Sequence, residues 1–96
     1  MAKTTPKKTK KRKVEFTLPA EAANEVILIG DFNKWNQKKH QMKKNGNGVW
    51  QKSVFLTPGT YEYKFKVDGK WQNDPTNALT CPNRFGTRNS FVIIPA

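Results

Sequence analysis

The chain has 96 residues, with 18 Lys and Arg against 7 Asp and Glu and a formal net charge of +11. A chain this short buries one thin core, which excludes folds as large as a catalytic barrel of about 250 residues. The charge is uneven, because seven basic and no acidic residues lie in residues 1–13. The rest of the chain is only mildly basic, so the net charge alone does not indicate a nucleic-acid-binding fold.

Residues 1–13 are poor in apolar side chains and rich in like charges, so we expect a disordered basic tail followed by one domain over residues 14–96. Cys81 is the only cysteine, which excludes an intrachain disulfide and a zinc cluster. The longest apolar run, residues 26–29, is too short for a signal peptide or a membrane span. We therefore expect a cytoplasmic monomer without a cofactor.

The first half of the domain predicts strands separated by polar turns. Residues 14–18 alternate apolar and polar side chains, the pattern of a strand with one buried face. Residues 24–30 are apolar and β-branched, which favours a central strand covered on both faces. Residues 31–36 form an aromatic-containing polar loop, and the Asn-Gly pairs of residues 43–48 predict a hairpin turn.

The second half continues the same pattern. A strand is expected over residues 49–56, and a Pro-Gly turn follows it. Residues 61–67 alternate cleanly, with Tyr61, Tyr63, Phe65 and Val67 on one face and Glu62, Lys64 and Lys66 on the other. An irregular stretch over residues 73–86 precedes a last strand at residues 89–94. Six or seven short strands without helical periodicity indicate an all-β sandwich or small barrel.

The residues that commonly carry catalysis are sparse. His40 is the only histidine and stands in a Lys- and Gln-rich segment, so we expect a solvated surface histidine without acid–base partners. Asp31, Asp68 and Asp74 each lie beside a turn, where aspartate commonly caps its own backbone. Neither set forms a recognisable acid–base pair, and we expect a chain that is not an enzyme.

The three tryptophans divide by their surroundings. Trp50 lies in an apolar strand and is expected in the core, whereas Trp35 and Trp71 stand in polar loops. An exposed indole offers apolar area to the C–H face of a sugar ring, and neighbouring amide and ammonium groups can bond its hydroxyls. From spacing alone, an equal alternative is that the two loop tryptophans fold down as lids over the core.

Four ordered motifs favour the first interpretation: GDFNKW at residues 30–35, PGTYEYKFKVDGKW at 58–71, NDP at 73–75 and FGTRNS at 85–90. This series resembles the glycogen-binding domain of the AMP-activated protein kinase β subunit and, more broadly, family-48 carbohydrate-binding modules. The resemblance extends over residues 14–94. It implies an immunoglobulin-like β-sandwich of about seven strands that binds α-glucans such as glycogen, starch or cyclodextrin without catalysis.

The resemblance also implies a set of sugar-contacting residues. Two tryptophans stack on glucose rings, a lysine contacts hydroxyls, and a threonine and an asparagine follow near the last strand. The kinase domain has a leucine that inserts into a curved sugar chain, and a phenylalanine stands at that position here. The implied carbohydrate-binding residues are Trp35, Lys64, Trp71, Phe85, Thr87 and Asn89. A glucan-active enzyme or a kinase is an implied partner of the module.

Two other function classes remain compatible with the composition. A small basic β domain with exposed aromatic residues can stack nucleic-acid bases. Most of the basic excess lies in the tail, however, and is not interleaved with the aromatic residues. The third class is a protein-interaction scaffold, which does not exclude glucan binding. The tail itself is expected to contact polyanions weakly.

Overall fold

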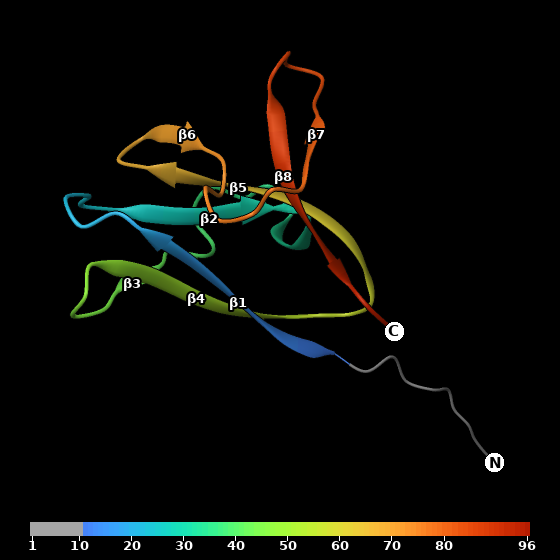
Figure 1. Cartoon of the computed structure of the whole chain (residues 1–96), viewed down its shortest axis with the longest axis horizontal. Coiled ribbons are helices and arrows are strands. Elements are labelled where there is room, and N and C mark those ends of the chain that lie inside the picture. Colours follow the sequence, from blue (N-terminus) through green and yellow to red (C-terminus); the bar gives the residue numbers. More distant parts are fainter. Residues whose placement is uncertain (1–10) are drawn as a thin grey trace.

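The computed structural model describes residues 11–96, which form two antiparallel β-sheets packed face to face (Figure 1). This confirms the expected all-β sandwich. The described part contains eight strands and one short 3-10 helix, namely β1 (Arg12–Pro19), β2 (Val26–Gly30), η1 (Asp31–Asn33), β3 (Lys43–Lys44), β4 (Val49–Leu56), β5 (Gly59–Val67), β6 (Lys70–Gln72), β7 (Thr80–Pro82) and β8 (Arg88–Ile94). No helix in this part of the chain is long and apolar enough to cross a membrane.

The first sheet has the order β1-β4-β3, with β4 in the middle. Its two long strands pair along their whole length, from Arg12 opposite Leu56 to Pro19 opposite Val49. The alternation expected for residues 14–18 is confirmed, because Phe16 and Leu18 are buried while residues 15 and 17 are not. Every second side chain therefore points toward the second sheet, and these side chains form the apolar face of the first sheet.

The second sheet has the order β2-β5-β8-β7, and β6 also pairs with β5. The nine-residue β5 is the strand to which three others pair. Its residues 63–67 pair with β2, residues 59–63 pair with β8, and residues 65–67 pair with β6. Tyr63 and Phe65 point into the core, as the period-two pattern predicts. Glu62 and Lys64 consequently lie on the opposite face of the sheet.

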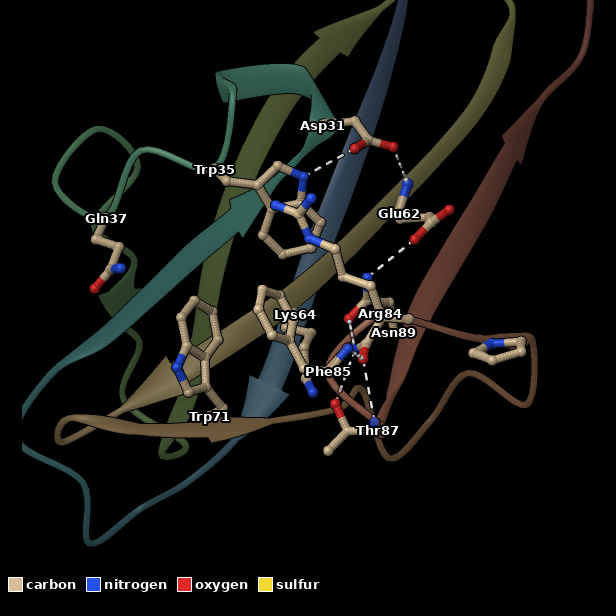
Figure 2. A pocket seen from close by; sticks show the side chains of 12 residues that line it. Asp31, Trp35, Gln37, Glu62, Lys64, Trp71, Arg84, Phe85, Thr87 and Asn89 are labelled. Carbon is tan, nitrogen blue, oxygen red and sulfur yellow. Dashed lines mark hydrogen bonds between the residues drawn. The ribbon is translucent and has the colours of Figure 1, made fainter.

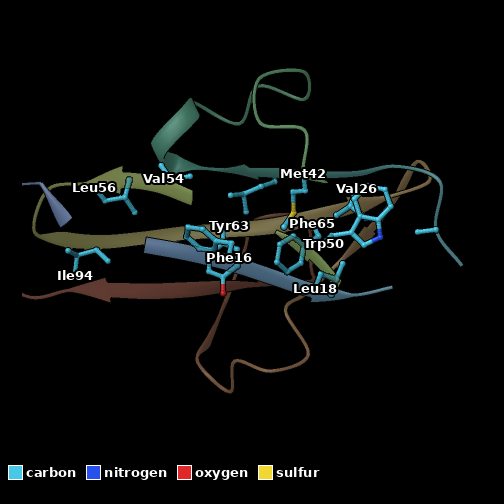
Figure 3. Packing of buried hydrophobic residues seen from close by; sticks show 12 residues of the cluster. Phe16, Leu18, Val26, Met42, Trp50, Val54, Leu56, Tyr63, Phe65 and Ile94 are labelled. Atoms are coloured by element: carbon cyan, nitrogen blue, oxygen red, sulfur yellow. The ribbon is translucent and has the colours of Figure 1, made fainter. Parts of the chain in front are cut away.

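Aromatic and aliphatic side chains from both sheets interdigitate between the layers (Figure 3). The ring centroids of Phe16 and Tyr63 are 4.9 Å apart, and the two rings meet edge to face. Tyr63 and Phe65 also meet edge to face. Trp50 is 7% exposed and its indole N–H donates to the carbonyl of Ala20 at 2.9 Å. The prediction of a core tryptophan at this position is confirmed.

The apolar strand β2 is buried at every residue, as expected, but it is not central. Among residues 11–96, the segment of residues 40–42 lies along the edge of β2 that faces away from β5. There the N–H of Leu28 donates to the carbonyl of His40, and the N–H of Met42 donates to the carbonyl of Val26. A single bridge between Ile27 and Gln41 completes this edge. The sequence pattern predicts a second neighbouring strand at this edge. An irregular segment instead satisfies the backbone hydrogen-bonding groups there.

Short strands account for the other differences from the expected pattern. Trp71 lies in β6 rather than in a loop, because its backbone pairs with Lys66 of β5. The stretch 73–86 contains the three-residue β7. β1 begins at Arg12, two residues before the expected start, and the Arg12 guanidinium donates to the carbonyls of Pro95 and Ala96. Residues 1–10 of the expected tail lie outside the described residues.

Gly30 is required for a reason that the sequence does not reveal. Gly59 and Gly69 have φ values of 150° and 85°, which residues with a side chain rarely adopt. Gly30 is instead fully extended, with φ −170°. A Cβ atom at Gly30 would lie 2.6 Å from the carbonyl oxygen of Glu62. Its lack of a side chain therefore permits β2 and β5 to approach closely at the end of the strand.

Candidate functional site

A cavity of about 920 Å³ opens on the face of the second sheet that points away from the core. Its walls come from the turn after β2, the outer face of β5, the strand β6 and the β7–β8 loop (Figure 2). The lining residues are Asp31, Trp35, Gln37, Glu62, Lys64, Trp71, Pro82, Asn83, Arg84, Phe85, Thr87 and Asn89.

All six residues that the sequence motifs single out lie around this one cavity. They are Trp35, Lys64, Trp71, Phe85, Thr87 and Asn89. Four segments contribute them, and the first and last of these residues are separated by more than half the chain. The alternative in which the loop tryptophans close over the core does not match this placement, because both line the cavity on the outer face.

Trp35 is held in a strained turn. The short helix η1 ends at Asn33, and both Lys34 and Trp35 then adopt left-handed conformations, with φ 57° and 58°. Such conformations are uncommon for residues with a Cβ atom and cluster at functional sites. The N–H of Trp35 donates to the carbonyl of Gly30 at 2.9 Å, which closes the turn. The turn thereby presents a half-buried indole to the cavity.

The indole orientation is set by Asp31. One carboxylate oxygen of Asp31 accepts from Trp35 Nε1 at 2.9 Å, and the other accepts from the backbone N–H of Glu62 at 2.8 Å (Figure 2). The side chain thus ties the indole to β5. Since the only polar hydrogen of the indole is already donated, Trp35 has its ring surface left to offer a ligand.

Trp71 forms a second aromatic wall and is 46% exposed. It lies on β6, opposite Lys66, whose ammonium group is 5.3 Å from the centroid of the indole ring. The same ammonium donates to Gln37 Oε1. Lys64, between the two tryptophans in sequence and on the cavity face of β5, makes no hydrogen bond to the described residues. Its ammonium group is therefore free to donate to a ligand.

The β7–β8 loop supplies the wall opposite. Phe85 is 78% exposed, and the Arg84 guanidinium carbon lies 5.4 Å from its ring centroid. Asn89 is 7% exposed, and its side-chain amide donates to Glu62 Oε1 at 2.9 Å. Thr87 is exposed on the same loop. The wall thus combines one free aromatic ring with polar groups that are partly committed to the protein.

Six further lining residues were not predicted, namely Asp31, Gln37, Glu62, Pro82, Asn83 and Arg84. Two of them had a signal in the sequence. Glu62 shares the outer face of its strand with Lys64 by the period of two. Asp31 lies four residues before Trp35, close enough for the two side chains to meet across a single turn. Of the other four, Gln37, Asn83 and Arg84 lie in irregular segments, and Pro82 ends the three-residue β7. In neither setting does a periodicity indicate the direction of a side chain.

His40 is not the solvated surface residue that its Lys- and Gln-rich neighbourhood predicts. Its ring is partly buried, and Nδ1 lies 2.8 Å from Asn33 Nδ2. Since Asn33 Oδ1 accepts from the Gly30 N–H, Asn33 Nδ2 is the donor and the imidazole Nδ1 is its acceptor. Burial, followed by the charges of Lys52 and Lys39, lowers the pKa of His40. The ring therefore supports the η1 turn rather than acid–base chemistry.

The carboxylates serve the fold as well. Asp68 accepts two backbone N–H bonds, from Asn24 and Glu25, as expected for a turn residue. Asp74 accepts from the hydroxyl of Tyr63 at 2.7 Å, and burial is the main cause that raises the pKa of that tyrosine. Asp31 and Glu62 line the cavity but already accept bonds from protein groups. Within residues 11–96 no cluster of three or more metal-ligating side chains is found.

An open cavity walled by the aromatic rings of Trp35, Trp71 and Phe85, with the Lys64 ammonium among them, suits a ligand that presents both apolar faces and hydroxyls. A β-sandwich with such a cavity on one sheet is the arrangement of a carbohydrate-binding module. The chain belongs to the carbohydrate-binding module 48 family (isoamylase N-terminal domain), whose family model matches residues 3–83. This confirms the resemblance that the motifs indicated. The match includes Trp35, Lys64 and Trp71, while Phe85, Thr87 and Asn89 lie beyond its end.

Similar proteins include two plant proteins and bacterial enzymes. The chain is 42% identical over 73 residues to protein PTST homolog 2, chloroplastic, of Arabidopsis thaliana, and 38% identical over 72 residues to protein FLOURY ENDOSPERM 6, chloroplastic, of rice (Oryza sativa subsp. japonica). These alignments cover 76% and 75% of the chain but 13% of each relative. A 1,4-alpha-glucan branching enzyme of Rhodopseudomonas palustris is 43% identical over 56 residues, which are 58% of the chain and 8% of the enzyme.

Proposed function

We propose that the cavity binds an α-glucan by stacking glucose rings on Trp35 and Trp71. The observation that supports this most directly is the position of the two indoles on one cavity. The Lys64 ammonium, which makes no hydrogen bond to another group of residues 11–96, lies on the strand between them. The apolar C–H faces of pyranose rings pack on indole rings, while ring hydroxyls accept bonds from the ammonium group. Binding of this kind needs no catalytic group.

The remaining residues have distinct proposed roles. Phe85 offers an exposed ring from the opposite wall, where a curved glucan chain would pack against it. The hydroxyl of Thr87 and the amide of Asn89 contribute polar contacts at the base of this wall. Asn89 has little exposed surface, so its contribution is expected to be the smallest of the six. The cavity is open, and affinity is therefore expected to be modest.

The choice of α-glucan rests on the relatives as well as on the rings. The branching enzymes that the chain resembles are named for 1,4-α-glucan, and their alignment includes only a small part of each enzyme. We propose that this chain likewise supplies the glucan-binding part of a larger activity. It would act as a non-catalytic monomer that brings a glucan-active enzyme or a kinase to its substrate.

The proposal is tested by titrating the protein with maltoheptaose or β-cyclodextrin while recording amide and indole NMR shifts. Trp71→Ala is expected to weaken binding roughly thirty-fold, since loss of an aromatic anchor commonly costs about 2 kcal/mol. Trp35→Ala should weaken it at least as much. Lys64→Ala should have a smaller effect, because water replaces part of the lost hydrogen bond.

Trp50→Ala is the control for general damage to the fold. Its indole fills the core, and removal of such a side chain typically costs about 3–5 kcal/mol of stability. Its melting temperature should fall sharply, whereas Trp71→Ala should melt close to the wild type because β6 is exposed. Folded Trp35→Ala and Trp71→Ala proteins with wild-type affinity for both sugars would refute the site.

A further inference from the structure

The β7–β8 loop raises the question of what fixes the Phe85 ring, which is largely free of the protein surface. We propose that Asn83 is a positioning residue that holds Phe85 in the wall of the cavity without itself bonding the ligand. This inference rests on the proposed glucan site and assigns part of its geometry to a residue that the motifs do not contain.

Residues 83–87 connect β7 and β8, and the bond between Asn83 and Thr87 encloses a tight loop of residues 84–86. The N–H of Asn83 donates to the carbonyl of Thr87 at 2.9 Å, and the N–H of Gly86 donates to the carbonyl of Asn83 at 3.3 Å. Gly86 has φ 82°. A three-residue hairpin loop with glycine in the left-handed conformation is a common connection between strands. The backbone of Asn83 therefore closes the loop that carries Phe85.

The side chain of Asn83 completes the closure. Its Oδ1 accepts from the backbone N–H groups of Phe85 at 2.9 Å and Thr87 at 3.1 Å. Its Nδ2 donates to Thr87 Oγ1 at 2.8 Å and to Asn89 Oδ1 at 2.9 Å. An asparagine side chain has two donor hydrogens and two acceptor lone pairs, so these four bonds use its whole capacity. Nothing remains with which Asn83 could bond a sugar.

The Phe85 ring has few other restraints. The ring is 78% exposed, and the side chain that stacks on it is the flexible Arg84. Its position must therefore come from the backbone, which Asn83 fixes on both sides of Gly86. From Asn83 the network continues through Asn89 to Glu62 on β5. This chain of bonds connects the loop to the strand that carries Lys64.

The same turn occurs a second time, far from the cavity. In the β3–β4 hairpin, Asn45 Oδ1 accepts from the N–H groups of Asn47 at 2.8 Å and Val49 at 3.2 Å. The N–H of Asn45 donates to the carbonyl of Val49, and Gly48 has φ 78°. None of these residues lines the cavity. Asn45 thus provides a matched control, with the same backbone role and no ligand nearby.

The first measurement needs no ligand. In Asn83→Ala the amide hydrogens of Phe85 and Thr87 should exchange at least about fivefold faster than in the wild type, because each loses its acceptor. Asn83→Asp keeps that acceptor and should protect both amides. Unchanged exchange in Asn83→Ala would overturn the positioning role whether or not the cavity binds glucans. Failure of the wild type to bind sugar would refute the site but leave this result standing.

The second measurement is a double-mutant cycle with β-cyclodextrin as the probe. Asn83→Ala and Phe85→Ala should each weaken binding by at least about fivefold. If Asn83 acts through Phe85, the double variant should bind no more weakly than Phe85→Ala alone. Additive losses would show that Asn83 contacts the sugar directly and would overturn the proposal, as would wild-type affinity in Asn83→Ala.

Asn45→Ala completes the design. It loses the same two acceptor bonds and should lower the melting temperature no more than Asn83→Ala does, while leaving the affinity for β-cyclodextrin at the wild-type value. An equal loss of affinity in Asn45→Ala would attribute the effect to general loosening of the fold and would overturn the proposal. If Asn83→Ala fails to fold, Asn83→Asp in the same cycle measures the loss of the two donor bonds alone.

Discussion

At the level of single residues, the main finding is that Asp31 serves the cavity and not only its own turn. Its two oxygens connect the Trp35 indole to the backbone of β5. The indole is therefore held in place before any ligand arrives. A side chain that is already ordered loses less entropy on binding, which increases affinity without adding a contact.

Asp31→Ala is accordingly expected to weaken maltoheptaose binding roughly two- to tenfold, since ordering one free side chain costs about 0.5–1.5 kcal/mol. Calorimetric titration measures the affinity, and the NMR resonance of the Trp35 indole N–H reports the lost bond. Asp31→Asn retains one acceptor oxygen and should fall between the two proteins. An unshifted indole resonance in Asp31→Ala would show that the bond does not orient the ring.

The sequence predicted the residues with side chains that line the cavity better than it predicted the residues that hold them in place. Trp35, Lys64 and Trp71 were found because they stand in specific motifs. Asp31 looked like an ordinary turn aspartate, since spacing along the chain does not reveal that one of its oxygens reaches a different strand. Asn83 had no signal, because its partners Thr87 and Asn89 come within reach of its side chain only when β7 and β8 pair.

At the level of secondary structure, the η1 turn depends on a neutral histidine. Asn33 donates one amide hydrogen to the carbonyl of Leu28 and the other to Nδ1 of His40. Protonation of Nδ1 would replace this hydrogen bond with two facing donors. The partly buried position and the charges of Lys52 and Lys39 also oppose protonation, which is why the pKa of His40 is lowered.

The sign of the resulting pH dependence follows from proton linkage. Because the pKa is lower in the folded protein than in the unfolded chain, the unfolded chain takes up the proton first as the pH falls below about 6.5. The free energy of unfolding should therefore decrease between about pH 7.5 and pH 5.5. His40→Gln, which cannot be protonated, should show a smaller decrease in urea titrations at the two pH values. An equal decrease in both proteins would contradict the assignment.

Long strands were predictable, and the very short ones were not. The eight or nine residues of β1 and β5 contain several periods of alternation, and both were identified from them. The strands β3, β6 and β7 have two or three residues and so carry no measurable period. For this reason the sequence predicts a loop at Trp71. Its strand exists because the backbone of residues 70–72 pairs with β5, which is a tertiary fact.

At the level of the whole molecule, the cavity is a product of strand order. Residues from 31 to 89 meet because β5 pairs with β2 on one edge and with β6 and β8 on the other. Hydrophobic alternation gives the buried face of each strand but not its neighbours. The family resemblance predicted an immunoglobulin-like sandwich. The hydrophobic pattern alone does not predict which strands pair.

The charge distribution predicts separate partners for the two parts of the chain. Residues 1–10 contain four lysines and no acidic residue. A protein lacking them should bind maltoheptaose with unchanged affinity, because neutral hydroxyls release no counterions. It should lose most of its retention on RNA at low salt, since that binding depends on phosphate contacts. Salt-insensitive RNA binding by the truncated protein would instead favour the nucleic-acid interpretation of the cavity.

The truncation must stop before Arg12. The Arg12 guanidinium donates to the carbonyls of Pro95 and Ala96, and its backbone pairs with Leu56. A protein that begins at residue 14 is therefore expected to melt at a lower temperature than one that begins at residue 11. Thermal unfolding of the two proteins separates this structural contribution from the loss of charge.

The repeated hairpin turn has a consequence for how such a module can diversify. Asn45 and Asn83 close their loops by the same backbone and Oδ1 hydrogen bonds. The side chains of the first two residues of each loop make no hydrogen bond to the described residues that closes it. In one loop these residues are Gly46 and Asn47, and in the other they are Arg84 and Phe85. Ligand preference at this wall can therefore change by replacing two neighbouring residues, with the scaffold left as it is.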